Sequence, residues 1–452
     1  MAGRARNGWL QAKGEILTHG FCSPSLSSSL PFCTSGYSPQ PPMVTVIIGE
    51  MGLSYAEFGS FLTRKILNEG AMVLFLLTFF LLYGGLHYYL FLKISAAVAL
   101  GGAFKIFLIL FLLVMVFAPL IGYGFERYGL ASVTRSISFI GYSWMGFAFL
   151  CFSCFIVMDL YRVLIYAGRL ISPSFLTHFN LSPQYSIFIS FFLSLSVALY
   201  GYFEAKQIRT ERIVVRTSKI PKDVDGLKVV QISDVHLGLI VREERLARIL
   251  QEVKKTNPDL LISTGDLVDG QINNLSGAAE ILREINPRYG KFAITGNHEF
   301  YAGLAQALDF TKNAGFSVLR GEGLTVAGLI NLAGVDDPAG QSFGLFREVS
   351  EKELLSGLPR EKFTLLLKHR PVLEKDALGL FDLQASGHTH QGQIFPFRII
   401  TRIFFPYDGG SFHLPNHSLL HVSRGSGTWG PPFRFLAPPE VTVYELIRED
   451  KP

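Results

Sequence analysis

The fold is decided by five short polar blocks in the second half of the chain, which read Asp234-Val235-His236, Gly265-Asp266-Leu267-Val268-Asp269, Gly296-Asn297-His298-Glu299, Lys368-His369-Arg370 and Gly387-His388-Thr389-His390. Each block follows or overlaps the end of an apolar run, and these runs are Leu227–Ile232, Leu260–Ser263, Phe292–Ile294, Thr364–Leu367 and Leu383–Ala385. Short runs of this composition are typical of buried strands in a layered α/β domain. Side chains just beyond strand ends converge on one rim of a sheet, where open α/β folds build their sites. The sequence therefore predicts a single site assembled from all five blocks.

The side chains in these blocks are suited to holding transition metals. If the first strand continues, Asp234 and His236 fall on the same side of it and can chelate one ion. Gly265 lets the backbone turn close to an ion, and the two oxygens of Asp266 can bridge two cations. The candidate ligands outnumber what one ion needs, so we expect two cations. The candidate ligands are Asp234, His236, Asp266, Asn297, His369, His388 and His390. Their mixed oxygen and nitrogen atoms favour Mn, with Fe or Zn possible, over Ca or Mg.

Each block taken alone has an ordinary structural explanation. A single Asp after a strand is often a helix cap, and a single buried His is usually satisfied by packing and hydrogen bonds. Gly-Asn-His alone is a common turn sequence. Five such blocks in a fixed order, each at the exit of an apolar run, are not explained in this way. The joint pattern therefore favours a metal site.

The five blocks resemble the signature of the calcineurin-like metallophosphoesterase superfamily, which is D-x-H, G-D-x-x-D, G-N-H-[DE], H and G-H-x-H. The resemblance covers about Leu227 to Leu446, with every block present. More narrowly, Ser386–Gln393 and Val422–Gly427 resemble the membrane-tethered branch of that superfamily. This branch includes transmembrane proteins with a metallophosphoesterase domain and UDP-2,3-diacylglucosamine pyrophosphatases.

The resemblance implies an α/β fold with four layers, in which two β-sheets pack between helices. It also implies that one metal is held by Asp234, His236, Asp266 and His390, and a second by Asp266, Asn297, His369 and His388. By the same resemblance, His298 stabilises or protonates the leaving group and Asp269 orients it, as a general acid and its partner.

Two arginines are further candidates for substrate binding. Arg370 directly follows His369, and Arg424 lies in the Gly-rich turn Ser423–Gly427. A guanidinium group matches phosphate geometry in bidentate fashion. A structural salt bridge is an equally good explanation of each arginine.

The first half of the chain has the composition of a membrane protein. Crossing a bilayer takes roughly 20 apolar residues, and four stretches meet this requirement: Ala71–Leu92, Phe104–Tyr123, Ile137–Met158 and Ser186–Tyr202. We expect a transmembrane region at 71–203, then a linker with a first strand at 204–226, and a catalytic domain at 227–452. Residues 1–70 are expected to be a disordered tail or an over-extended start.

The positions of basic residues predict the orientation in the membrane. Four crossings place both ends of the chain on the same side, and that side carries the larger number of Lys and Arg residues beside the spans. The positive-inside rule then places the catalytic domain in the cytoplasm of a multi-pass membrane protein. The net charge of +5 is modest, so no nucleic-acid partner is expected.

The leading functional hypothesis is a membrane-anchored two-metal phosphoesterase that hydrolyses a phosphodiester, pyrophosphate or phosphomonoester. Because the site is tethered to a bilayer, we expect a lipid-linked substrate. One alternative is a broad-specificity or cyclic-nucleotide phosphodiesterase that is anchored to the membrane. Another is a non-catalytic membrane scaffold that has retained the fold. An apolar groove facing the membrane would favour the lipid, and a narrow polar cleft would favour a nucleotide.

Overall fold

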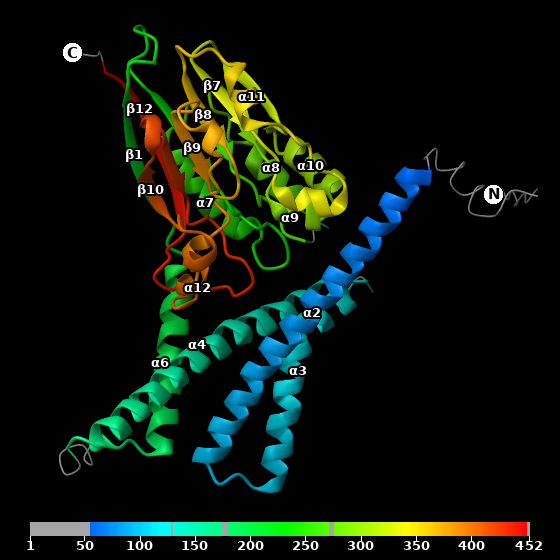
Figure 1. The fold of residues 1–452 in the computed structure, drawn as a ribbon, viewed down its shortest axis with the longest axis vertical. Coiled ribbons are helices and arrows are strands. Elements are labelled where there is room, and N and C mark those ends of the chain that lie inside the picture. The colour runs from blue at the N-terminus through cyan, green and yellow to red at the C-terminus, as the bar shows by residue number, and fades with distance from the viewer. Residues whose placement is uncertain (1–54, 128–129, 173–178, 271–274, 450–452) are drawn as a thin grey trace, which may run out of the picture. The chain divides into compact units, whose positions relative to one another are not determined.

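The computed structural model describes residues 55–127, 130–172, 179–270 and 275–449 (Figure 1). The chain divides into two compact units, residues 1–67 and 68–452, and the whole α/β domain belongs to the second. The expectation for residues 1–54 lies outside the described residues. Residues 55–70, which were expected to belong to the same tail, form the beginning of helix α2.

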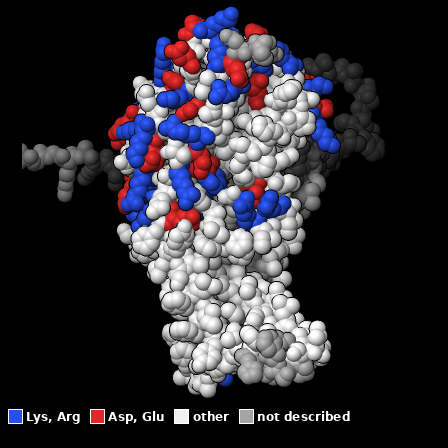
Figure 2. Space-filling view, turned by 90° about the vertical axis from the view of Figure 1, so that its left-hand side faces the viewer, with Lys and Arg blue, Asp and Glu red and all other residues white. Residues whose placement is uncertain are grey.

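Four long apolar helices precede the α/β domain, and they are α2 (Tyr55–Ala97), α3 (Gly102–Arg127), α4 (Ala131–Arg169) and α6 (Pro183–Glu204). Each contains a segment long and apolar enough to cross a membrane, namely Leu76–Ala97, Gly102–Ile121, Ser132–Arg169 and Pro183–Glu204. Large apolar side chains point outward from these helices; Leu81, for example, is 74% exposed. Figure 2 shows charged side chains gathered on one part of the molecule, while the remaining surface of that face is almost free of charge.

The first sheet has six strands in the order β1-β12-β2-β3-β4-β5. Their bounds are β1 Arg209–Thr217, β12 Glu440–Arg448, β2 Leu227–Ile232, β3 Leu260–Ser263, β4 Lys291–Ala293 and β5 Ser317–Val318. Strands β2 to β5 run parallel, and β12 pairs antiparallel with β2. The carboxyl ends of β2, β3 and β4 therefore lie along one edge of the sheet.

The second sheet also has six strands, in the order β10-β11-β9-β8-β7-β6. Their bounds are β10 Gly410–His413, β11 Leu419–Val422, β9 Leu383–Ser386, β8 Phe363–Leu367, β7 Ile330–Gly334 and β6 Glu322–Val326. Strands β7, β8, β9 and β11 are parallel to one another, and β6 and β10 close the two edges in the antiparallel sense.

Helices cover the outer faces of the two sheets. The α-helices are α7 Glu243–Thr256, α8 Ser276–Arg283, α9 Asn297–Tyr301, α10 Leu304–Asn313, α11 Glu351–Ser356 and α12 Phe397–Phe404. Four short 3-10 helices complete the described elements: η2 Pro338–Phe343, η3 Lys375–Ala377, η4 His390–Gly392 and η5 Pro415–His417.

The four layers arise because successive side chains along each strand pack on opposite faces of its sheet. In β3, Leu260 and Ile262 belong to the apolar cluster between the two sheets, whereas Leu261 belongs to the cluster under helices α7, α8 and α10. In β8, Leu365 likewise faces the other sheet and Leu366 faces the outer layer that contains α11. Successive side chains on a strand point to opposite faces, so strands that are apolar throughout can be buried on both sides. The predicted four-layer α/β fold, preceded by four apolar helices, is confirmed.

Candidate metal centre

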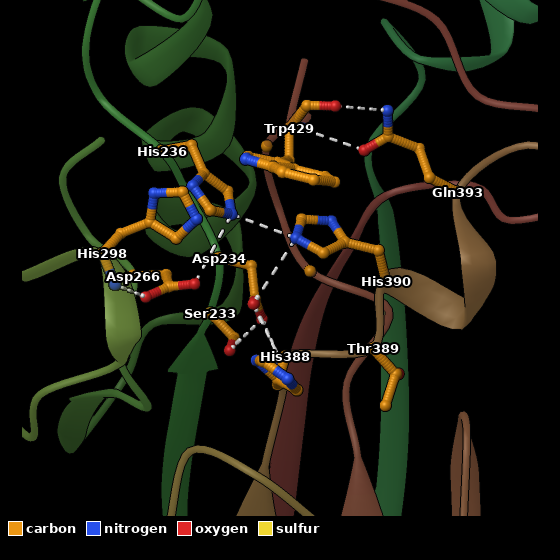
Figure 3. Close-up of polar contacts among 12 residues, drawn as sticks. Ser233, Asp234, His236, Asp266, His298, His388, Thr389, His390, Gln393 and Trp429 are labelled. Carbon is orange, nitrogen blue, oxygen red and sulfur yellow. Dashed lines mark hydrogen bonds and ion pairs between the residues drawn. The ribbon is translucent and has the colours of Figure 1, made fainter. Parts of the chain in front are cut away.

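The five polar blocks meet at the facing carboxyl ends of the two sheets. The Nε2 atom of His369, which follows β8, lies 3.2 Å from Oδ2 of Asp266, which follows β3. The same carboxylate oxygen lies 3.8 Å from Nε2 of His236, which follows β2. All three side chains are buried. The convergence predicted from the strand ends therefore occurs around Asp266 (Figure 3).

Imidazole nitrogens face each other in two places at this centre. His236 Nε2 lies 3.0 Å from His390 Nε2, and His388 Nδ1 lies 3.2 Å from His369 Nε2. His390 Nε2 is also 3.6 Å from Oδ1 of Asp234. Ring nitrogens that face each other this closely need a proton or a cation between their lone pairs. This donor set is the one that transition metals prefer.

Three overlapping groups of side chains could each hold a metal ion. In each group the candidate ligand atoms lie within 4.8 Å of one another. The groups are Asp234 with His236 and His390, His236 with Asp266 and His298, and Asp266 with His369 and His388. Asp266 and His236 each belong to two groups, so the arrangement can accommodate neighbouring ions that share ligands.

The side-chain oxygen of Asn297 is the strongest sign that a ligand belongs here. Asn297 begins helix α9, is 7% exposed and lines the cavity beside the centre. Its Oδ1 atom is buried and has no hydrogen-bond partner among the described residues. Buried polar atoms are nearly always satisfied in folded proteins. A cation would satisfy this oxygen, and the residues present therefore fit a metal centre.

Contacts outside the cluster hold the candidate ligands in place. His369 donates from Nδ1 to the backbone carbonyl of Thr264 at 2.8 Å, which holds the ring with Nε2 directed at Asp266. The carboxylate of Asp234 accepts hydrogen bonds from the backbone N–H of His388, at 2.9 Å, and from the hydroxyl of Ser233. These contacts fix the orientation of the rings and carboxylates before any ion binds.

The backbone at the centre is strained. Asp234, His236, Asp266, His388 and His390 all have positive φ values, between 48° and 72°. The first strand does not continue through Asp234 and His236, because β2 ends at Ile232 and the chain turns. Such conformations are rare outside glycine and cluster at functional sites.

Glu299 is a positioning residue that the sequence reasoning set aside. Its buried carboxylate accepts hydrogen bonds from the backbone N–H groups of Gly296 (2.6 Å), Asp266 (3.0 Å) and Leu267 (2.8 Å). It thereby ties the turn after β3 to the start of α9. A Glu at the third position of a helix is a recognised capping signal, so the sequence could have revealed this role.

Arg434 is a second residue that the sequence reasoning missed. Its side chain is fully buried and donates to the carbonyls of Gly427, Arg424 and Ala437. Its Nη2 atom lies 3.0 Å from Nδ1 of His390. No sequence signal indicates this contact, because Arg434 lies outside all five blocks.

His298 and Asp269 form a hydrogen-bonded pair next to the cluster. His298 donates from Nδ1 to Oδ1 of Asp269 at 2.8 Å, and its ring lines the cavity. Burial acts to lower the pKa of His298, but the charge of Asp266 and the hydrogen bond to Asp269 raise it to about 9. The hydrogen bond to Asp269 therefore fixes the orientation of the His298 ring at the cavity.

The two candidate arginines are paired with carboxylates. Arg370 donates to both oxygens of Asp337, at 2.7 and 2.9 Å. Arg424 pairs with Glu440 at 2.5 Å and also with Glu211. Neither is among the residues that line the described cavity. Substrate binding by either arginine stays a prediction.

Comparison with known proteins decides the family. The sequence pattern of the family described as calcineurin-like phosphoesterase matches residues 227–392. An uncharacterized metallophosphoesterase of Aquifex aeolicus is 40% identical over 256 residues, which are 56% of this chain and 98% of that protein. The chain belongs to the calcineurin-like phosphoesterase family. The resemblance drawn from the five blocks is confirmed, and this phosphoesterase is a metal-dependent hydrolase of phosphate esters.

Relatives with membrane segments are also similar to this phosphoesterase. A zebrafish (Danio rerio) protein named transmembrane protein with metallophosphoesterase domain is 31% identical over 268 residues, covering 56% of this chain and 61% of that protein. A solved dimetal phosphatase from Danio rerio is 14% identical with a TM-score of 0.29, covering 44% of this chain and 87% of that one. Family members use a dimetal centre, and this phosphoesterase presents candidate ligands for one.

Proposed function

We propose that this phosphoesterase is a multi-pass membrane protein that hydrolyses a lipid-linked phosphodiester, pyrophosphate or phosphomonoester, using two divalent cations per chain. The proposal extends the family's activity to one class of substrate. It is supported above all by the cavity beside the metal centre.

The cavity combines polar and apolar walls. Its volume is about 500 Å³, within the usual range for ligand sites. Candidate metal-site residues line it, including Asp266, Asn297 and His298. Much of the remaining wall is apolar, and it includes Leu86, Met145, Phe149, Phe397, Ile400 and Phe404. A substrate whose phosphate group lies beside the metal centre could therefore place an attached apolar chain against this wall.

Part of the apolar wall comes from the candidate membrane spans. Leu86 belongs to α2, and Met145 and Phe149 belong to α4. Trp144 of α4 donates to Nε2 of His87 of α2 at 2.8 Å, which fixes the two helices against each other. A nucleotide needs polar groups around its base and sugar, and this wall has few. It is suited to the acyl or prenyl part of a lipid.

The ligand assignment follows the contacts around Asp266. We assign one cation to Asp234, His236, Asp266 and His390, and the other to Asp266, Asn297, His369 and His388. When bound, such a pair of cations supplies an activated water and stabilises the charge on the phosphoryl oxygens. The geometry gives no preference between metals, and Mn is proposed from the mixed oxygen and nitrogen ligands.

The protein's own residues would handle the leaving group. His298 is held by Asp269 through Nδ1, so its other ring nitrogen is free to donate a proton within the cavity. The hydrogen bond to Asp269 acts to raise the pKa of His298 and so favours its protonated form. A proton delivered to the leaving oxygen avoids the formation of an alkoxide or a free phosphate trianion.

The proposal includes the orientation in the membrane. With four spans, the larger number of basic residues on the flanks supports a cytoplasmic α/β domain. A protease that is added outside right-side-out vesicles should then leave the catalytic domain intact, and it should digest that domain once the vesicles are opened.

The proposed function can be tested with purified protein in phospholipid nanodiscs supplied with Mn. The substrates are UDP-2,3-diacylglucosamine, which the resemblance suggests, a dialkyl phosphodiester lipid, a cyclic nucleotide and a soluble aryl phosphodiester. Lipid phosphate should be released with a higher kcat/KM than either soluble ester gives. If the cyclic nucleotide is the better substrate, the lipid assignment is wrong and the nucleotide alternative holds.

A matched pair of variants shows whether the observed hydrolysis arises at this centre. Asp266→Asn changes the carboxylate shared by both cations, and Asp376→Asn makes the same change at an exposed position. Losing an outer contact of a metal ligand costs about 10–100-fold, so losing the shared ligand should cost at least this much. Asp376→Asn should retain the activity of the unmodified protein. Equal activities would assign the hydrolysis to a contaminant.

A further inference from the structure

Helix α12 exposes apolar side chains that no other part of the described chain covers. Ile399 is 58% exposed, and Ile403 and Phe404 are each 73% exposed. A surface helix of a water-soluble domain normally turns polar residues outward. Of the eight residues in α12, only Thr401 is buried. The helix is therefore apolar on a side that would otherwise face water.

The other side of the same helix forms part of the cavity wall. Phe397, Ile400 and Thr401 line the cavity beside the metal centre, and so does Phe404 at the end of the helix, although 73% of it is exposed. Phe405, which follows the helix, is in ring contact with His388 at 5.0 Å between centroids. Helix α12 thus lies between the candidate metal centre and the surroundings that its exposed side faces.

A ring contact with α4, and a neighbouring apolar cluster just before α12, place α12 beside the candidate membrane spans. The ring of Phe397 lies 6.0 Å from that of Phe149 in α4, and Ile394 packs with Leu150. Val197 of α6 packs against the same cluster, and it lies seven residues before the end of that helix at Glu204. Seven residues of helix correspond to about 10 Å.

The charged and aromatic residues around α12 are those expected at the boundary of a membrane. Arg402 is exposed, with its Nε atom 3.7 Å from Asp408, and Arg398 pairs with the same carboxylate at 2.6 Å. Trp429, whose ring lies 6.1 Å from that of His298, is 53% exposed. Arginine side chains reach phosphate headgroups, and tryptophan is enriched at membrane–water interfaces.

We propose that α12 lies in the phospholipid bilayer interface, with Ile399 and Ile403 inserted among the acyl chains, and forms the membrane-side entrance of the cavity. The proposal rests on the proposed function, because it gives the lipid substrate its route to the centre. The occupant of this surface is the bilayer that the four spans already cross, rather than a second copy of the chain or another protein.

Photo-crosslinking tests the membrane contact without using enzyme activity. A benzophenone amino acid is placed at Ile403 or, as a control, at Val214, which is also exposed but lies on β1. The full chain is assembled in nanodiscs of phosphatidylcholine and phosphatidylglycerol and irradiated. We expect lipid adducts at residue 403 to exceed those at residue 214 by at least about tenfold. Equal adducts, or adducts between two protein chains at residue 403, would overturn the proposal.

A pair of double variants tests the entrance. Ile399→Glu/Ile403→Glu places charges on the exposed side of α12, and Val214→Glu/Leu345→Glu adds the same charges at other exposed apolar positions. The α12 variant should lose at least about tenfold in hydrolysis of a bilayer-embedded lipid phosphoester, because charges are excluded from the acyl region. Its hydrolysis of a soluble aryl phosphodiester should be unchanged, which also shows that it has folded. The control should keep both activities.

The two experiments separate this proposal from the proposed function. If lipid adducts form at residue 403 but no lipid phosphoester is cleaved, the interfacial helix stands and the lipid substrate does not. If a lipid phosphoester is cleaved equally by both double variants, the substrate stands and the entrance through α12 is wrong.

Discussion

His298 donates a 2.8 Å hydrogen bond from Nδ1 to the carboxylate of Asp269, so a single contact fixes both the ring orientation and the tautomer of the candidate general acid. The two residues belong to different blocks, one after β3 and the other after β4. Their contact exists because those parallel strands are neighbours in the sheet. Variants of these two residues can therefore distinguish proton donation by His298 from simple substrate binding.

Replacing His298 with Asn should affect poor leaving groups most. An alkyl phosphodiester needs a proton on its leaving oxygen, and loss of a general acid costs about 10²–10⁴-fold in rate. A nitrophenyl ester leaves without help and should lose much less. His413→Asn, at an exposed position, is the matched control. Equal losses for both esters would show that His298 does not donate a proton.

The pH dependence should follow the Asp269 contact. The hydrogen bond to Asp269 raises the pKa of His298, so kcat/KM for alkyl esters should fall on the basic side as the ring loses its proton. Asp269→Asn removes a negative charge that favours the protonated ring, so the basic limb should move to lower pH. Asp309→Asn, at a position away from the cavity, should leave the profile unchanged. A basic limb that does not move would show that Asp269 does not affect the pKa of the proton donor.

Asn297→Ala should remove one cation of the pair. The orphaned Oδ1 atom is the only neutral oxygen among the proposed ligands, and alanine offers no replacement. The metal content measured after reconstitution should therefore fall from about two ions per chain to about one. Asn313→Ala, at the exposed end of α10, should keep the original content. An unchanged content in Asn297→Ala would exclude this residue from the ligands.

Glu299→Gln should destabilise the turn that carries Asp266. The carboxylate accepts several backbone hydrogen bonds at once, and hydrogen bonds to a charged group contribute about 1.5–3 kcal/mol. A loss of about 2 kcal/mol corresponds to a fall in Tm of about 4–8 °C for a domain of this size. Glu280→Gln, which is exposed on α8, should change Tm little. Thermal unfolding of the detergent-solubilised protein measures both.

The sequence was sufficient to predict the strands that carry the site. The apolar runs before Asp234, Asp266 and Asn297 coincide with β2, β3 and β4 to within a residue or so, because strands buried on both faces are rich in apolar residues. Their parallel order then brings the polar blocks to one edge. This is why residues far apart in the sequence could be expected to meet.

Other features depend on tertiary contacts that no local pattern encodes. The positive φ values at Asp234 and His236, for example, could not be read from the sequence, which left open whether the first strand continues there. The contact of Arg434 with His390, and the cavity wall supplied by Phe149, arise from segments outside the five blocks. Helix α12 follows the last block. Its exposed apolar side can be interpreted only when its position beside the candidate membrane spans is known.

The most direct test of a two-cation phosphoesterase is a measurement of metal content together with activity. The full chain is purified in nanodiscs, stripped with a chelator, reconstituted with Mn, Fe or Zn, and analysed by mass spectrometry of the bound metal. We expect about two ions per chain with at least one metal, and hydrolysis of a lipid phosphoester that returns with them. Fewer than one ion per chain with every metal, together with no hydrolysis of any phosphate ester, would contradict the two-cation centre.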